Sequence, residues 1–162
     1  MVASVYVISG TPGTGKTTVG QMLSEEGYPV MNLQQFAIEH ECQDGFDEIR
    51  DSVIIDEDKL HDKLVEFLEE QEGDWIIEGH YGDLVPEHFV IQCFILTADL
   101  KELRKRLASR NYSKEKIEEN IEAEIMKECW ITALDSFGED RVIEISPLPQ
   151  EEVFEVIRKG IM

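Results

Sequence analysis

The chain has 162 residues, 42% of them hydrophobic, which allows one domain with a real core and leaves little room for a second. Its formal net charge is −20, and such acidity repels the phosphates of nucleic acids and of anionic membranes. We therefore expect no membrane binding and no strong direct nucleic-acid binding by the bulk surface. The acidity either suits a basic protein partner or simply keeps the protein soluble.

The cysteine content points to a reducing compartment. Cys42, Cys93 and Cys129 are odd in number and show no C-x-x-C pairing, so we expect neither a disulfide framework nor a zinc site. The first residues do not form a basic segment followed by an apolar one, and no apolar run reaches the roughly 18 residues of a membrane span. We expect a soluble cytoplasmic protein.

A phosphate-binding motif lies between the first predicted strand and the first predicted helix. Residues 10–18 read Gly-Thr-Pro-Gly-Thr-Gly-Lys-Thr-Thr, which fits G-x-x-x-x-G-K-[ST] at every fixed position. A short apolar run at 3–8 precedes the motif, and Val19, Met22 and Leu23 follow it at the spacing of a buried helix face. This context favours a phosphate loop over a glycine-rich turn that binds no ligand.

Each fixed position of this loop has an expected task. Gly13 and Gly15 let the backbone curl so that its N–H groups face an anion, and the following helix adds its partial positive end. Lys16 is expected to reach the β- and γ-phosphates, and the hydroxyl of Thr17 to ligate Mg²⁺. Thr18 is expected near the α-phosphate. The motif therefore predicts binding of a nucleoside triphosphate, ATP, with magnesium.

The next elements follow from local signals. The first helix is predicted to end before Gly27, a typical left-handed terminal residue. A short strand follows at 28–31, where Pro29 indicates a sheet edge or a strand start, and Asn32 can cap the helix after it. The acidic, polar stretch 41–51 predicts a mobile flap or loop.

The rest of the chain continues the alternation of helices and strands. The expected elements are a helix opened by Asp56-Glu57-Asp58, strands at 75–77 and 89–96, a helix set by Leu100, Leu103 and Leu107, a long helix with Ile117, Ile121, Ile125 and Leu134 inward, a strand at 142–145 and a closing helix at 151–159. This order predicts an α/β fold with a parallel sheet covered on both faces. A P-loop, five strands and two helical excursions describe a P-loop NTPase of nucleoside monophosphate kinase architecture, a three-layer sandwich with a five-stranded parallel sheet.

An acid at the end of a neighbouring strand normally holds Mg²⁺ or its water beside a P-loop nucleotide. Asp56, Glu78 and Asp99 each end an apolar run. Asp99 is better explained as a helix N-cap, and Asp56 equally well as a cap or as the acid. We prefer Glu78, because a strand that closes on acid-Gly lies beside the phosphate loop in such folds. His80 follows at the right distance to position a water, although a structural histidine is the alternative.

One basic cluster stands out in this acidic chain. Arg106 and Arg110 are spaced i, i+4, so they lie on one face of a helix that ends near the nucleotide. The planar guanidinium of Arg110 suits a transferring phosphate. For Arg106, as for the other cations between 104 and 116, a solvated helix face is the favoured interpretation.

These stretches together resemble the adenylate kinase isoenzyme 6 family of small archaeal and eukaryotic nucleotide kinases and ATPases. The resemblance spans nearly the whole chain and rests on residues 10–18, 56–58, 78–80, 106–112 and 116–125. The phosphate loop is common to many families. The Arg-x-Tyr motif followed by Lys-x-x-x-Asn and a glutamate is more specific. The lack of extended additions suits an archaeal member of the family.

The resemblance implies a broad-specificity nucleoside monophosphate kinase with intrinsic ATPase activity that acts in late maturation of the small ribosomal subunit. It implies transient binding to a basic platform ribosomal protein and, in a eukaryotic homologue, a nuclear as well as cytoplasmic location. It also implies one domain over 1–162, in which 32–55 form the monophosphate-binding excursion and 109–119 a short lid, with Arg110 on ATP. Glu78 and His80 take the positions that serve the metal and the water.

Three departures from the family pattern bear on the acceptor. Glu78 stands where the family usually has aspartate, and Ile38 stands where an arginine is expected. Tyr81 and Gly82 follow His80 where larger adenylate kinases carry an arginine. Because few cations then hold an acceptor phosphate, the alternative is mainly an ATP-hydrolysing assembly factor with little kinase activity. A GTPase switch is disfavoured because no Asn-Lys-x-Asp guanine reader is present.

Overall fold

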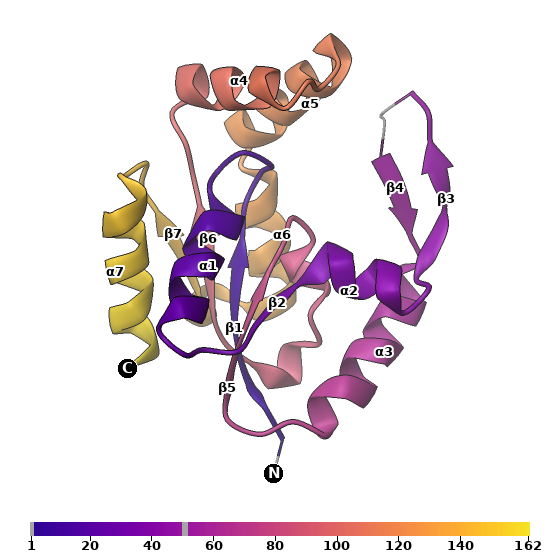
Figure 1. Cartoon of the computed structure of the whole chain (residues 1–162), viewed down its shortest axis with the longest axis vertical. Helices are drawn as coiled ribbons and strands as arrows, with labels where there is room; N and C mark the ends of the chain where they lie inside the picture. Colours follow the sequence, from indigo (N-terminus) through magenta and orange to yellow (C-terminus); the bar gives the residue numbers. More distant parts are fainter. Residues whose placement is uncertain (1, 50–51) are drawn as a thin grey trace.

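In the computed structural model, which describes residues 2–49 and 52–162, helices alternate with strands along most of the chain (Figure 1). The strands are β1 (Ser4–Ser9), β2 (Val30–Asn32), β3 (Gln43–Asp47), β4 (Ser52–Ile55), β5 (Asp74–Glu78), β6 (Val90–Leu96) and β7 (Val142–Ile145). The α-helices are α1 (Lys16–Glu25), α2 (Leu33–Glu39), α3 (Glu57–Glu69), α4 (Leu100–Ser109), α5 (Lys114–Ile125), α6 (Glu128–Phe137) and α7 (Gln150–Ile161).

The main sheet confirms the predicted α/β class. Five strands run parallel in the order β2-β5-β1-β6-β7. The edge position of β2 agrees with the signal from Pro29. In the register of the sheet, Ile8 of β1 and Asn32 of β2 both pair with Glu78 of β5, so three strands end at one level. Segments that leave these carboxyl ends therefore start side by side.

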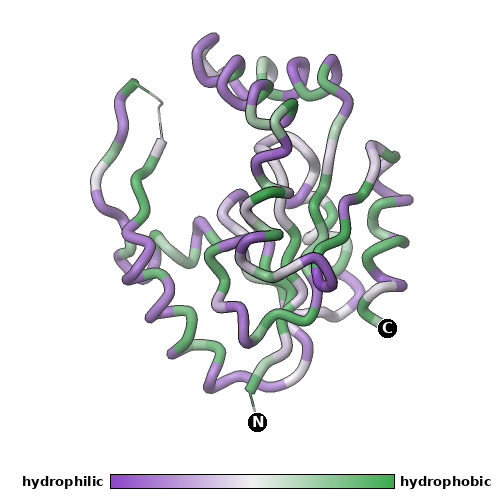
Figure 2. Tube along the Cα trace, turned by 180° about the vertical axis from the view of Figure 1, so that it is seen from behind, coloured by the Kyte–Doolittle hydropathy of each residue, from purple (hydrophilic) through white to green (hydrophobic). Residues whose placement is uncertain are grey.

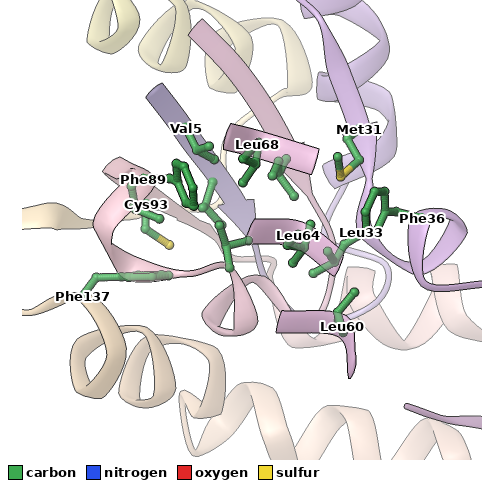
Figure 3. Packing of buried hydrophobic residues seen from close by; sticks show 14 of the residues in the cluster. Val5, Met31, Leu33, Phe36, Leu60, Leu64, Leu68, Phe89, Cys93 and Phe137 are labelled. Carbon is green, nitrogen blue, oxygen red and sulfur yellow. The ribbon is translucent and has the colours of Figure 1, made fainter. Parts of the chain in front are cut away.

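The alternation of side chains along β1 divides the core into two halves. Val5 and Val7 belong to a cluster under α2, α3 and α6, whereas Tyr6 and Ile8 belong to a second cluster under α1 and α7. Figure 3 shows part of the first cluster, where the inward leucines of α3 lie over the strands. In Figure 2 the hydrophobic residues concentrate on the central strands, while the helices alternate hydrophobic and hydrophilic positions. The three-layer sandwich follows from these two clusters.

The structure confirms the helix starts and ends that were predicted from neighbouring residues. The side chains of Asn32, Asp56 and Asp99 each accept a hydrogen bond from a backbone N–H in the first turn of the next helix. Gly27, at φ 101°, directly follows Glu26, the C-cap residue of α1, as predicted. Cys93 is fully buried in β6, as expected for a thiol within an apolar run. The helix predicted from Leu100, Leu103 and Leu107 is α4, in which Leu103 and Leu107 are buried and Leu100, at the first position, is 40% exposed.

The predicted flap or loop at 41–51 is wrong at residues 43–47, because these form β3, which pairs antiparallel with the following strand β4. Phe46 lies opposite Val53, and Asp47 opposite Ser52. Since most side chains of this hairpin are exposed or half-buried, its sequence carries no alternation of buried and exposed residues that would mark a strand. Residues 50 and 51 of the expected flap lie outside the described residues.

The predicted long helix is also wrong, because it is divided into α5 and α6. Lys127 has the left-handed φ of 54° and separates the two helices. Neither glycine nor proline marks this point, so the sequence alone predicts continuity. The break lets α5 pack against α4 through Ile121, while α6 packs on the sheet through Phe137. Ile125, expected to face inward, is 58% exposed at the end of α5.

Within residues 2–49 and 52–162, no helix has both the length and the apolar character needed to cross a membrane.

Candidate nucleotide-binding site

The motif of residues 10–18 forms the turn between β1 and α1, which confirms its predicted context. Gly15 has a φ of 101° and precedes Lys16, the first residue of α1. Gly13 has a φ of 93°, and a Cβ atom at this position would lie 2.9 Å from Cδ1 of Leu103 in α4. Both the backbone and the close approach of α4 therefore require glycine at this point.

Lys16 is buried and points back into the loop. Its Nζ donates hydrogen bonds to the carbonyl oxygens of Gly10, at 2.8 Å, and Thr11, at 3.1 Å. Burial lowers the pKa of this ammonium to about 8, and repulsion from Arg110 acts in the same direction. The two carbonyls carry no full charge, so phosphate oxygens are stronger partners for this cation.

Glu78 ends β5 beside this loop and is only 4% exposed. Its Oε2 accepts hydrogen bonds from Nδ2 of Asn32, at 2.9 Å, and from Oγ1 of Thr17, at 3.4 Å. The side chain of Thr17 is exposed on the first turn of α1, as is that of Thr18. A carboxylate and a hydroxyl beside a phosphate loop form the hard oxygen set that Mg²⁺ uses together with water and phosphate, so these residues fit the ion.

His80 lies two residues beyond Glu78, with its Nδ1 3.4 Å from the carbonyl oxygen of Gly10 and 4.0 Å from Sγ of Cys129. Burial lowers the pKa of this imidazole, and the charge of Lys16 lowers it further. Both effects favour the neutral ring. When Nδ1 carries the proton and donates to Gly10, Nε2 is left as an acceptor. Burial raises the pKa of Cys129 to about 11, so its thiol stays protonated beside the ring.

The two arginines of α4 reach different parts of the site. Arg106 donates from Nη1 to the carbonyl oxygen of Gly13, at 3.0 Å, so its favoured interpretation as a solvated residue is wrong. Arg110 is exposed at the C-terminus of α4 and lines the cavity that contains Lys16. Lys116 was also expected to be solvated, but its Nζ lies 4.1 Å from the centre of the Tyr112 ring.

A cavity of about 140 Å³ brings together the five residues predicted for chemistry and metal binding. These lining residues are Lys16, Thr17, Glu78, His80 and Arg110. Gly13, Gly15 and Thr18, which were predicted to contact the nucleotide, belong to the same turn and the first turn of α1 without lining this cavity.

A larger cavity of about 540 Å³ adjoins the first, and the two linings share Pro12, Gln34, His80, Tyr81 and Tyr112. The hairpin β3–β4 provides one wall and α5 another, and both rise above the carboxyl ends of the sheet (Figure 1). Its described lining includes four carboxylates, from Asp47, Glu57, Glu119 and Glu128. Lys116 is the single lysine or arginine in that described lining.

Several contacts of the site had no prominent signal in the sequence. Asn32 was expected only as a helix cap, yet its amide nitrogen also bonds Glu78. Glu124 bonds Thr11 of the phosphate loop, and its only signal was its place in the stretch that carries the family resemblance. Ile38, which raised doubt about the acceptor, is 45% exposed on α2 and lines neither cavity.

Comparisons with known proteins agree with this architecture. A family model described as an AAA domain matches residues 7–127. The solved structure of a gluconokinase from Sinorhizobium meliloti superposes with a TM-score of 0.62 at 17% identity, over 98% of this chain and 91% of that one, which shows a shared fold.

Two curated relatives are much closer in sequence. "Adenylate kinase isoenzyme 6 homolog FAP7" of Saccharomyces cerevisiae is 36% identical over 149 residues, 91% of this chain and 75% of that protein. "Adenylate kinase isoenzyme 6 homolog" of Schizosaccharomyces pombe is 39% identical over 155 residues, 93% of this chain and 83% of that protein. At this identity over most of both sequences, the chain belongs to the adenylate kinase isoenzyme 6 family.

Proposed function

We propose that this protein transfers the γ-phosphoryl group of ATP to a nucleoside monophosphate and also hydrolyses ATP. The observation that carries the proposal is the pair of adjoining cavities, one at the phosphate loop and one under the hairpin, with His80 in both linings. A donor phosphate in the first cavity faces an acceptor in the second. Family membership and the names of the relatives support the same activity.

In this proposal, the residues of the small cavity act mainly by position and charge. Lys16 exchanges the carbonyls of Gly10 and Thr11 for the β- and γ-phosphate oxygens. Thr17 and Glu78 hold Mg²⁺, which supplies positive charge to the phosphates when it is bound. Arg110 adds a guanidinium at the mouth of the cavity, where the charge of the transferring group is spread over its oxygens.

Hydrolysis and transfer differ in the nucleophile. In hydrolysis, a water oxygen forms the bond to the γ-phosphorus, the bond to the β–γ bridging oxygen breaks, and Nε2 of His80 accepts the proton of the water. In transfer, a phosphate oxygen of the monophosphate takes the place of the water. That oxygen carries no proton to remove, so transfer depends less on His80.

The acceptor belongs in the larger cavity, with residues 32–55 as the monophosphate-binding excursion and 109–119 as the short lid. The rings of Phe46, Tyr81 and Tyr112 in its lining offer surfaces for a base. In the described part of the lining, four carboxylates stand beside one lysine; this set holds a phosphate weakly and favours hydrolysis over transfer.

The charge of the cavity and the net charge of −20 favour a second function beside the first, that of an ATP-dependent assembly factor. A strongly acidic protein attracts a basic partner and speeds the encounter. In accord with the family resemblance, the proposed partner is a basic ribosomal protein of the small-subunit platform. Pull-down from cell extract at increasing salt tests it, and recovery of no ribosomal protein at low salt counts against it.

Removing the imidazole of His80 separates the two reactions. We expect His80→Ala to lower ATP hydrolysis by about 100-fold or more, while phosphoryl transfer to the best acceptor persists. The measurement is ADP production with and without AMP, CMP, GMP, UMP and their deoxy forms. His88→Ala is the control, because His88 is exposed and lines neither cavity. If no monophosphate raises ADP production above the hydrolysis background, the kinase proposal fails. If hydrolysis survives in His80→Ala, the role of His80 is wrong.

The lowered pKa of Lys16 predicts a pH dependence of ATP binding. Below a pH of about 8 the ammonium is charged before ATP arrives, so affinity is constant with respect to this group. Above it, the bound phosphates favour the charged form, binding takes up a proton, and affinity falls by up to about tenfold per pH unit. Titration of ATP with Mg²⁺ between about pH 7 and 9.5 measures this. The inflection should be absent from Lys16→Met, and its persistence there would assign it to another group.

A further inference from the structure

Glu124 of α5 joins three segments that are far apart in the sequence. Its Oε1 accepts a hydrogen bond of 2.9 Å from Oγ1 of Thr11 in the phosphate loop. Its Oε2 accepts one of 2.9 Å from the backbone N–H of Ala98, two residues beyond the end of β6. Each oxygen of one carboxylate thus holds a different element, and movement of α5 acts on both.

Thr11, the loop residue that Glu124 contacts, also takes part in the hydrogen bonds within the phosphate loop. The side chain of Thr11 is 1% exposed, and its backbone carbonyl accepts hydrogen bonds from Nζ of Lys16 and from Oγ1 of Thr14. The charge of Glu124 also acts on Lys16, whose pKa it raises against the larger effect of burial. A shift of Thr11 therefore displaces one of the two carbonyl oxygens to which Lys16 donates hydrogen bonds.

Glu124 also continues a row of polar side chains along α5. Lys116, Asn120 and Glu124 are spaced i, i+4 and i+8, which places them on one helix face. Lys116 and Asn120 line the larger cavity, and Nδ2 of Asn120 donates to the carbonyl oxygen of Lys116. One helix face thus runs from the proposed acceptor cavity to the phosphate loop.

We propose that Glu124 is a positioning residue for the phosphate loop. It fixes Thr11, and with it the Thr11 carbonyl that Lys16 leaves when ATP binds, relative to α5 and the end of β6. The inference rests on the proposed function only in that ATP is the ligand of the loop. Loss of the Glu124–Thr11 bond weakens ATP binding and turnover without removing any group that touches the nucleotide.

Two pairs of variants test the bond from both ends. We expect Glu124→Ala and Thr11→Val each to lower kcat/KM for ATP by about 10- to 100-fold, the usual range for a residue that orients a ligand-binding group. Glu124→Gln restores most of the loss, because its amide oxygen can accept from Ala98 while its NH₂ group donates to the Thr11 hydroxyl. Thr11→Ser restores most of the loss of Thr11→Val, because the hydroxyl returns. Glu122→Ala is the matched control on the exposed side of α5.

The readouts are the dissociation constant of a fluorescent ATP analogue, single-turnover hydrolysis and the melting temperature. In the double variant Thr11→Val/Glu124→Ala, the losses should fall well short of additive, since both changes remove one bond. Additive losses, or a Glu124→Ala protein with lower melting temperature and unchanged ATP binding, would overturn the inference. If Glu124→Ala does not fold, Thr11→Val against Thr11→Ser decides. A wild type that binds no ATP refutes the proposed function instead.

Discussion

Replacement of Lys16 by methionine is expected to reduce ATP turnover by about 1,000-fold, while the fold is kept. The loss follows because the cavity at the loop keeps Arg110 as its remaining lysine or arginine among the described lining residues. A preorganised group aimed at charge that develops in the reaction contributes about 100- to 1,000-fold by itself, and a full positive charge on two phosphates contributes at the upper end.

The stability of Lys16→Met distinguishes this loss from unfolding. The wild-type ammonium is buried, and its hydrogen-bond partners among the described residues are two uncharged carbonyls, so the native state carries the cost of a buried charge. Methionine is similar in length and apolar, so the free energy of unfolding should stay the same or rise. Turnover and urea unfolding of Lys16→Met are compared with Lys105→Met, whose lysine is exposed on α4. A destabilised Lys16→Met protein, or one that retains turnover, contradicts the proposed role.

Replacement of Glu78 by glutamine is expected to lower turnover by about 100- to 1,000-fold at limiting Mg²⁺. The change removes one negative charge and leaves the shape almost unchanged. Glutamine can still accept the hydrogen bond from Asn32 through its amide oxygen, so β2 and β5 stay joined at their ends. The loss should therefore come from weaker holding of the metal and not from a displaced strand.

A titration of ADP production with Mg²⁺ measures this effect, and more Mg²⁺ should recover part of the activity. Glu78→Asp keeps the negative charge on a shorter side chain, so this variant should lose less activity than Glu78→Gln. Glu70→Gln, at an exposed position after α3, is the control. Equal Mg²⁺ dependence in wild type and Glu78→Gln would remove Glu78 from the metal site and reopen the question of which acid serves it.

Signals within a few residues predicted the parts of the site that a single segment builds. The phosphate loop is a local pattern between a strand and a helix, and the caps at Asn32, Asp56 and Asp99 join atoms two or three residues apart. The end of β5 at Glu78 also follows from a short apolar run that stops at an acid. In such cases the residues that interact lie in one window of the sequence, where spacing and side-chain type are enough.

Contacts between residues far apart in the sequence could not be predicted from such local patterns. Arg106 meets the carbonyl of Gly13 across 93 residues, and Glu124 meets Thr11 across 113. The hairpin β3–β4 lacked a buried face to mark it, and the break at Lys127 occurs without glycine or proline. In each case the deciding energy comes from packing or hydrogen bonds between distant segments, which no local pattern records.

The sequence by itself determined the α/β class, the phosphate loop and the five residues now found in one cavity, because each depends on local preference and on the shared edge of a parallel sheet. Only the tertiary structure decided that a larger, carboxylate-rich cavity adjoins them and that Glu124 holds the loop. Those features arise where the hairpin, α4 and α5 fold over the sheet, and their positions depend on packing between elements rather than within them.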